Sequence, residues 1–212
     1  MADDLKYGYK GAEPTQSFGN NTGVFDPNDI NNLIADNKWT SFGQLELIET
    51  KNVSASSSAI FTSIQESTYN VHFMTVNNFQ VTNDNQRIFL RFFENGVEET
   101  ASVYQVANQQ GRASGTFSEQ RSTGQDHIRF VTSTGNSTGE SGNGYMYFYN
   151  LGDSSKYSFT TMHSTTLNGT PEYFMEFGSG VLPQASTVDQ IKLYVSAGTF
   201  DCTASLYGIR YS

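Results

Sequence analysis

The chain has 212 residues, which is long enough for one sizeable hydrophobic core or two small ones. Its net charge of −9, with no run of Lys or Arg, excludes nucleic-acid binding by counterion release and argues against anionic membranes. Aromatic residues reach 14%, while charged residues make up only 16%. This skew favours β-strands, in which aromatic side chains fit well.

The N-terminal 43 residues differ from the rest of the chain. The first 23 are polar, rich in Gly and Asn, and have no hydrophobic period. Asp26 is a good N-cap and Pro27 suits the first helical position, so we expect one short helix over about 27–37. Phe25 and Ile30 have the spacing of a hydrophobic staple. The residues that we expect to anchor this arm are Phe25, Ile30, Leu33, Ile34, Trp39 and Phe42.

A helix of this length is marginal alone in water. Its apolar stripe of Ile30, Leu33 and Ile34 must therefore be buried, either on the rest of the chain or on another subunit. The sequence has neither the charged-then-apolar pattern of a signal peptide nor an apolar run of membrane-spanning length. We expect a protein that is made in a cytoplasm and leaves it by lysis or within an assembly.

From residue 44 onward, apolar residues recur with a period of two, between clusters of Gly, Asn, Asp and Ser. This pattern is typical of short strands. The expected strands cover 45–48, 59–61, 69–74, 87–92, 103–106, 128–131, 145–149, 157–159, 173–177, 191–195 and 200–211. With turn signals and no helical pattern between them, the strands predict antiparallel pairing. We expect residues 44–212 to form an all-β, antiparallel sandwich of jelly-roll type.

Two segments, 109–125 and 132–144, are rich in Gly, Ser and Thr and are predicted to be long loops. They could serve recognition or be passive connections, and the sequence does not decide between the two. Tyr145, Tyr147 and Tyr149 form a row on one strand face. The interpretation as inward-facing core is favoured over an outward-facing contact with a ligand or a subunit.

The sequence offers little catalytic chemistry, and we predict no enzyme, catalytic residue, metal site or cofactor. His72 alternates with Val71 and Phe73 and is expected on the outward face, while His127 and His163 are expected to be surface or cross-strand histidines.

Two further features involve residue types that can carry chemistry. Glu172 and Glu176 lie on one strand beside aromatics, as in a sugar-processing groove, but strand carboxylates usually face solvent. Cys202, the only cysteine, is expected to be a small buried hydrophobe.

Several stretches nevertheless resemble known proteins. The sequence Gly-Asn-Asn-Thr-Gly-Val-Phe at 19–25, followed by a polar helix and Trp39, resembles a motif of phage tail and fibre proteins. That motif has Gly-x-Trp where this chain has Asn-Lys-Trp at 37–39. The stretches 45–64 and 198–209 look like strands of sandwich domains in phage virion proteins, and the whole chain is similar to virion proteins of marine cyanophages.

This resemblance implies a virion structural protein of the fibre, tail or capsid-decorating type. Its expected partners are other virion proteins, bound through residues 1–43, and copies of itself, with a trimer favoured. The alternative is a glycan-binding module that recognises host-surface carbohydrate. The position on the virion and the partner stay open.

Overall fold

The computed structural model describes residues 27–36 and 45–210, and every structural statement below concerns these residues. The chain divides into two compact units, residues 1–43 and residues 44–212, which are described separately. This division coincides with the predicted boundary between the arm and the sandwich.

In the first unit, helix α1 spans Pro27–Ala35. The predicted start at Pro27 is confirmed, and the helix ends two residues before the predicted 37. Asp29 lies in the first turn, where a carboxylate interacts favourably with the helix dipole. None of the nine helical residues is buried, and Ile34 is 55% exposed. The predicted staple and cap residues Phe25 and Asp26 lie outside the described residues.

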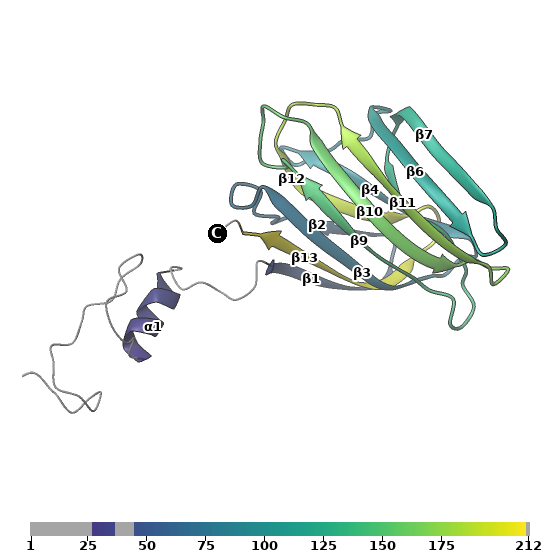
Figure 1. Ribbon diagram of the computed structural model, residues 1–212, viewed down its shortest axis with the longest axis horizontal. Helices are drawn as coiled ribbons and strands as arrows, with labels where there is room; N and C mark the ends of the chain where they lie inside the picture. The colour runs from purple at the N-terminus through teal and green to yellow at the C-terminus, as the bar shows by residue number, and fades with distance from the viewer. Residues whose placement is uncertain (1–26, 37–44, 211–212) are drawn as a thin grey trace, which may run out of the picture. The chain divides into compact units, whose positions relative to one another are not determined.

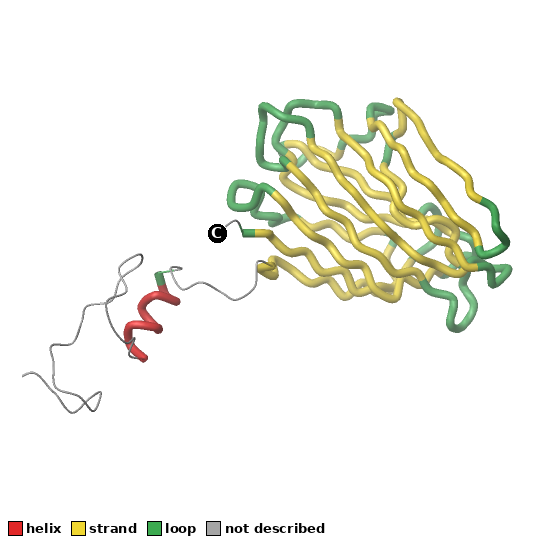
Figure 2. Tube along the Cα trace, in the orientation of Figure 1, coloured by secondary structure: helices red, strands yellow, loops and turns green. Residues whose placement is uncertain are grey.

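The second unit is an antiparallel β-sandwich, as predicted (Figures 1 and 2). The strands of the larger, eight-stranded sheet, in spatial order, are β1 (Leu45–Ser56), β13 (Phe200–Ile209), β3 (Val71–Val81), β9 (Gly142–Tyr149), β10 (Ser158–Leu167), β11 (Tyr173–Leu182), β6 (Tyr104–Arg112) and β7 (Phe117–Gln125). The strands of the smaller sheet are β2 (Ser58–Phe61), β12 (Val188–Val195), β4 (Gln86–Glu94), β5 (Val97–Glu98) and β8 (Ile128–Thr134). Both β5 and β8 pair with β4.

Each of the eleven predicted strands overlaps a strand of the structure, although several observed strands are longer than predicted, and β5 and β7 were not predicted. The predicted loop at 109–125 is wrong, because residues 104–125 form the β6–β7 hairpin. The sequence of β7 is polar and none of its residues is buried, so it carries no hydrophobic alternation. The predicted loop at 132–144 is shorter than expected, since β8 extends to Thr134 and β9 begins at Gly142.

The core lies between the inner faces of the two sheets. Large fully buried side chains come from both sheets and from their connections: Phe61, Ile64, Met74, Phe79, Ile88, Leu90, Phe92, Tyr104, Ile128, Phe130, Phe148 and Phe200. Each buried apolar side chain of this size contributes about 1.5–3 kcal/mol. The described core of the second unit is built from its own strands and connections.

Strand β8 packs closely against the larger sheet because that sheet has glycines beneath it. A Cβ at Gly144 would lie 2.7 Å from the Phe130 ring and 2.5 Å from the His163 carbonyl oxygen. A Cβ at Gly180 would lie 2.7 Å from the Ile128 side chain. These two inner-face positions require glycine if β8 is to keep its place.

Candidate functional site on the outer face of the larger sheet

The tyrosine row of β9 faces outward. Met146 and Phe148 are fully buried on the inner face, whereas Tyr145 is 42% exposed and Tyr147 and Tyr149 are partly exposed. The favoured sequence interpretation of these tyrosines as core is therefore wrong. Both faces of β9 carry large apolar residues, so alternation alone could not tell which face is inside.

The strand register extends this row into a wider surface. Tyr147 lies opposite Phe73 on β3, and Phe73 lies opposite Tyr207 on β13. On the other side, Tyr149 lies opposite Phe159 on β10. We call this surface the aromatic face, and its ring-bearing members are Phe73, Tyr145, Tyr147, Tyr149, Phe159, His163, Tyr173, Phe177 and Tyr207.

The rings of the aromatic face contact one another. The Phe73 and Tyr147 ring centroids lie 4.8 Å apart, and Tyr147 and Tyr149 are stacked at 6.5 Å. The imidazole of His163 meets Tyr145 edge to face at 5.8 Å. The Tyr149 hydroxyl lies 3.2 Å from Thr161 Oγ1. These contacts hold several rings in fixed relative positions while leaving their outer sides accessible.

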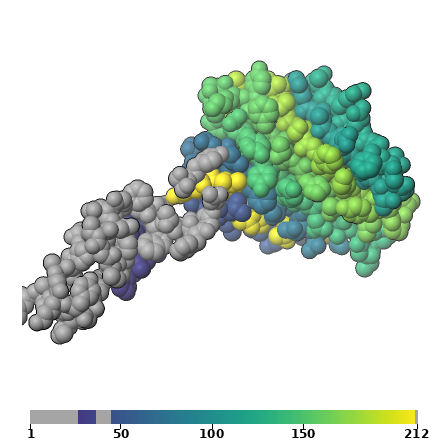
Figure 3. Space-filling model, in the orientation of Figure 1, coloured from purple at the N-terminus to yellow at the C-terminus, as the bar shows by residue number. Residues whose placement is uncertain are grey.

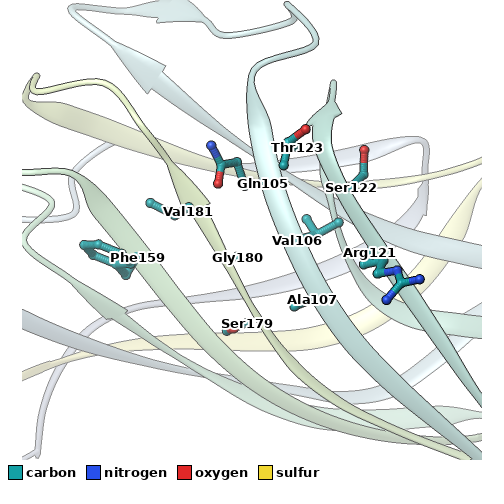
Figure 4. A pocket seen from close by; sticks show the side chains of 10 residues that line it. All are labelled: Gln105, Val106, Ala107, Arg121, Ser122, Thr123, Phe159, Ser179, Gly180 and Val181. Carbon is teal, nitrogen blue, oxygen red and sulfur yellow. The ribbon is translucent and has the colours of Figure 1, made fainter.

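The aromatic face is hollowed by a series of depressions. One, of about 630 Å³, is lined by the tyrosine row together with Thr161, His163 and Phe177. A second, of about 540 Å³, is lined by residues of β10, β11, β6 and β7, and Figure 4 shows Phe159, Val181 and Gln105 on successive strands there.

Two smaller depressions lie at the sides of the first. One shares Phe177 with the 630 Å³ depression, and the other shares Tyr145 and His163 with it. The smaller depression that contains Phe177 also shares Ala107 and Arg121 with the 540 Å³ depression, so the four adjoin one another, and we call this shallow series the channel. Figure 3 views this side of the sandwich, with β9 to β11 in green and β6 and β7 in teal.

Fixed charge is nearly absent from this channel. Among the described residues of β3, β9, β10 and β11, no outward-facing side chain is Asp, Glu, Lys or Arg. The same holds for β6 as far as Gly111, and Arg112 is its last residue. The lining charges come from edge strand β7, where Arg121 and Glu119 form an exposed ion pair at 3.3 Å. The channel is therefore uncharged along its length and neutral at its edge.

The outer face of the smaller sheet is very different. Arg91 forms ion pairs with Glu98 and Asp126, and its guanidinium lies 4.9 Å from the Tyr194 ring centroid. Lys192 also binds Glu98, at 2.8 Å. Burial raises the pKa of Glu98, but the ion pairs with Lys192 and Arg91 outweigh it and hold the pKa below its usual value. The aromatics of this face are thus engaged by charged partners.

The predicted outward position of His72 is wrong. Its side chain is fully buried, and Nε2 lies 2.8 Å from the Ile64 carbonyl oxygen. Val71 and Phe73 lie on the outer face although they are apolar. The prediction took them as inward-facing and therefore placed His72 outside. Burial lowers the pKa of His72. The His127 and Phe89 ring centroids lie 3.9 Å apart with the rings tilted, and His127 Nδ1 lies 2.6 Å from Asp126 Oδ1.

The two carboxylates considered as a glycosidase pair do not share a groove. Glu176 is 1% exposed on the inner face, where its Oε1 accepts hydrogen bonds from Arg129 and from Asn108. The expectation that it faces solvent is wrong, because Arg129 supplies a partner from β8. Glu172 precedes β11, and its Oε1 lies 3.4 Å from the Ser114 amide.

Cys202 is buried, as predicted, and burial raises the pKa of its thiol to about 12. Within the described ranges, no group of three or more His, Cys, Asp and Glu residues is arranged to hold a metal ion. The described helix is also too short to cross a membrane.

The structure places only half of the predicted anchoring residues. Ile30 and Leu33 are partly exposed and Ile34 is exposed on α1, whereas Phe25, Trp39 and Phe42 lie outside the described residues. The sequence reasoning missed Phe73, Phe159, Phe177 and Tyr207 as members of a surface. The sequence feature that could have indicated this surface is that apolar residues occupy both faces of the strands that carry them.

In comparisons with known proteins, no family model matches the chain, and neither a curated protein nor a solved structure matches it.

Proposed function

We propose that the protein is a non-enzymatic structural component of a bacteriophage virion, of the fibre, tail or capsid-decorating type. Residues 1–43 dock onto another virion protein and residues 44–212 display the sandwich. Copies of the chain associate, with a trimer favoured. The resemblance of 19–25 and of the strands at 45–64 and 198–209 to phage proteins supports the virion setting.

One structural observation carries the docking part of this proposal. Helix α1 presents Ile30, Leu33 and Ile34 on one stripe, yet none of its residues is buried. A nine-residue helix gains too little from its own hydrogen bonds to be stable alone. A surface that covers this stripe would supply the missing stabilisation, and another virion protein is such a surface.

Particle incorporation tests the docking. A chain that lacks residues 1–42 should be absent from purified particles, as should the variant Ile34→Asp, which places a charge on the stripe. Asn31→Asp adds the same charge at an exposed polar position of α1 and should be incorporated normally. Normal incorporation of the deletion variant would refute docking through this segment. Light scattering of the purified full chain tests the trimer.

A second candidate function is recognition of a host-surface glycan by the sandwich. The observation that favours it is the outward-facing tyrosine row at the floor of a depression of about 630 Å³. Depressions of this volume fall within the range of small-molecule sites. A displayed component can serve both functions, since docking uses residues 1–43 and recognition uses the sheet.

A further inference from the structure

We propose that the aromatic face binds an uncharged polysaccharide chain, which lies across β9, β10, β11 and β6 along the channel. The inference deepens the second candidate function, on which it rests, by naming the ligand class and the surface that binds it. The surface is the outer face of the eight-stranded sheet, and the connections between strands are not required.

The charge distribution selects a neutral ligand. A sulfated, phosphorylated or uronic-acid chain would need cationic partners, because desolvating an anion without compensation is costly. Among the described residues that line the channel, Arg121 at the β7 edge is the one cationic side chain, and it already forms an ion pair with Glu119. A cationic ligand would likewise find no outward-facing carboxylate along β9, β10 and β11, since Glu176 of β11 is buried on the inner face. The chain has a net charge of −9, yet its aromatic face carries almost no charge. This face therefore suits an uncharged ligand.

The chemistry of the lining matches a sugar. Sugar rings have apolar C–H faces and polar hydroxyl edges, so they need flat π surfaces beside hydrogen-bonding groups. Tyr147 and Phe177 provide rings, and Thr161 and His163 lie between them on the neighbouring strand. Farther along, Phe159 lies opposite Val181, and the polar side chains of Ser179 on β11 and Gln105 on β6 lie on that same side of it (Figure 4).

The shape of the surface favours a polymer over a single sugar. The two larger depressions both lie over β10 and β11, one smaller depression shares lining residues with each of them, and the other continues the hollow toward β3. Each larger depression has a volume typical of a small-molecule site. A ligand with repeated units would occupy several depressions at once, and the contacts in each depression would add to its affinity.

A second copy of the chain fits this face less well. A two-fold contact would bring the same hollowed surface of each copy together, and hollow against hollow leaves voids. Such voids lose the dispersion contacts that stabilise close-packed interfaces. We therefore treat self-association through the face as the competing outcome of the test.

Affinity electrophoresis and calorimetry of the full chain against a panel of soluble polysaccharides test the proposal. The neutral probes are galactomannan, xylan, mixed-linkage β-glucan and dextran, and the charged probes are alginate, heparin and carrageenan. We expect binding to at least one neutral probe and to none of the charged ones. Tyr147→Ala should weaken that binding about tenfold or more, and Tyr147→Phe should change it less than about threefold.

Two further variants make the test specific. Thr161→Lys places a charge at an exposed position of the channel and should abolish binding to the neutral probe. Val97→Ala is the matched control, because Val97 is 69% exposed on β5 of the other sheet. It should bind as the unchanged protein does. Thermal melting of each variant establishes that it is folded.

Several results would overturn the proposal. Binding only to charged probes would reject the neutral ligand while leaving glycan recognition intact. Binding to no probe would reject both, and unchanged binding by Tyr147→Ala would reject the surface. Dimers that Tyr147→Ala dissociates, without polysaccharide binding, would assign the face to self-association. None of these results bears on docking through residues 1–43, which is read from particle incorporation.

Discussion

Replacing Arg129 with methionine should destabilise the sandwich strongly. Arg129 donates two hydrogen bonds to Glu176 Oε1, at 2.9 and 2.7 Å, and the Glu176 side chain has no exposed surface. Methionine keeps the apolar stem of the arginine but leaves this carboxylate buried without its cation. Breaking a buried pair by removing one partner costs about 3–5 kcal/mol. For a domain of this size, that corresponds to a fall in melting temperature of about 6–20 °C.

The loss should depend on pH. In the unchanged protein the pKa of Glu176 is already raised, because burial outweighs the opposing effects of Arg129 and Asn108. A raised folded-state pKa gives a contribution to stability that is fully present below the ordinary pKa of 4.5 and is lost as pH rises. Arg129→Met raises the pKa of Glu176 further. Its cost should therefore be smaller at pH 4 than at pH 7.5, by about 1.4 kcal/mol for each added pKa unit.

Guanidinium chloride unfolding at the two pH values measures both effects. Two variants serve as controls. Arg121→Met removes an arginine whose ion pair is exposed, and it should change stability by less than about 1 kcal/mol. The double variant Arg129→Met/Glu176→Met should recover most of the loss, since an apolar pair avoids the buried charge. Equal losses at both pH values, or no recovery in the double variant, would refute the reasoning.

Three further results are expected. Gly144→Ala should lower the unfolding free energy by about 1–3 kcal/mol in denaturant titrations, because its Cβ would collide with the Phe130 ring; an unchanged midpoint would contradict the packing of β8. Cys202 should not react with a thiol reagent at pH 8 until the protein unfolds, since its thiol pKa is about 12, and rapid labelling of the native protein would be inconsistent with its burial. His72 has a lowered pKa, so its contribution to stability is present above 6.5 and is lost as pH falls through the lowered value. In melting experiments between pH 7.5 and 5, His72→Gln should therefore lose less stability than the unchanged protein, and identical pH profiles would argue against a buried neutral imidazole.

The strand pattern was predictable because most strands bury one face against the opposite sheet. In β4, for example, Ile88, Leu90 and Phe92 are fully buried and alternate with outward-facing residues, so the period of two is visible in the sequence. Strand β7 has no buried residue and left no such pattern. Its position follows from hydrogen bonding to β6, which polar side chains do not reveal.

The face of a strand was harder to predict than its existence. In β3 and β9 both faces carry apolar residues. Alternation therefore divides the side chains of each strand between two faces, but it does not show which face is buried. The choice depends on sheet order, which places β3 and β9 side by side although they are separated by about seventy residues. This is why His72 was placed outside and the tyrosine row inside, and why the aromatic face was not predicted.

The buried charge pair was also beyond the sequence pattern. Glu176 lies 47 residues from Arg129, and the two meet only because β8 packs beneath β11. A carboxylate in a strand predicts solvent exposure on average. A specific partner across the sandwich reverses that expectation, and no local signal identifies it.

Selective isotope labelling of the tyrosine rings, followed by magnetic resonance during titration with a neutral oligosaccharide, tests the aromatic face most directly. Signals of Tyr145, Tyr147 and Tyr149 should shift together with ligand concentration. The signal of Tyr194, on the outer face of the smaller sheet, should stay in place. Shifts confined to Tyr194, or saturation of binding with the three β9 signals unmoved, would contradict the account.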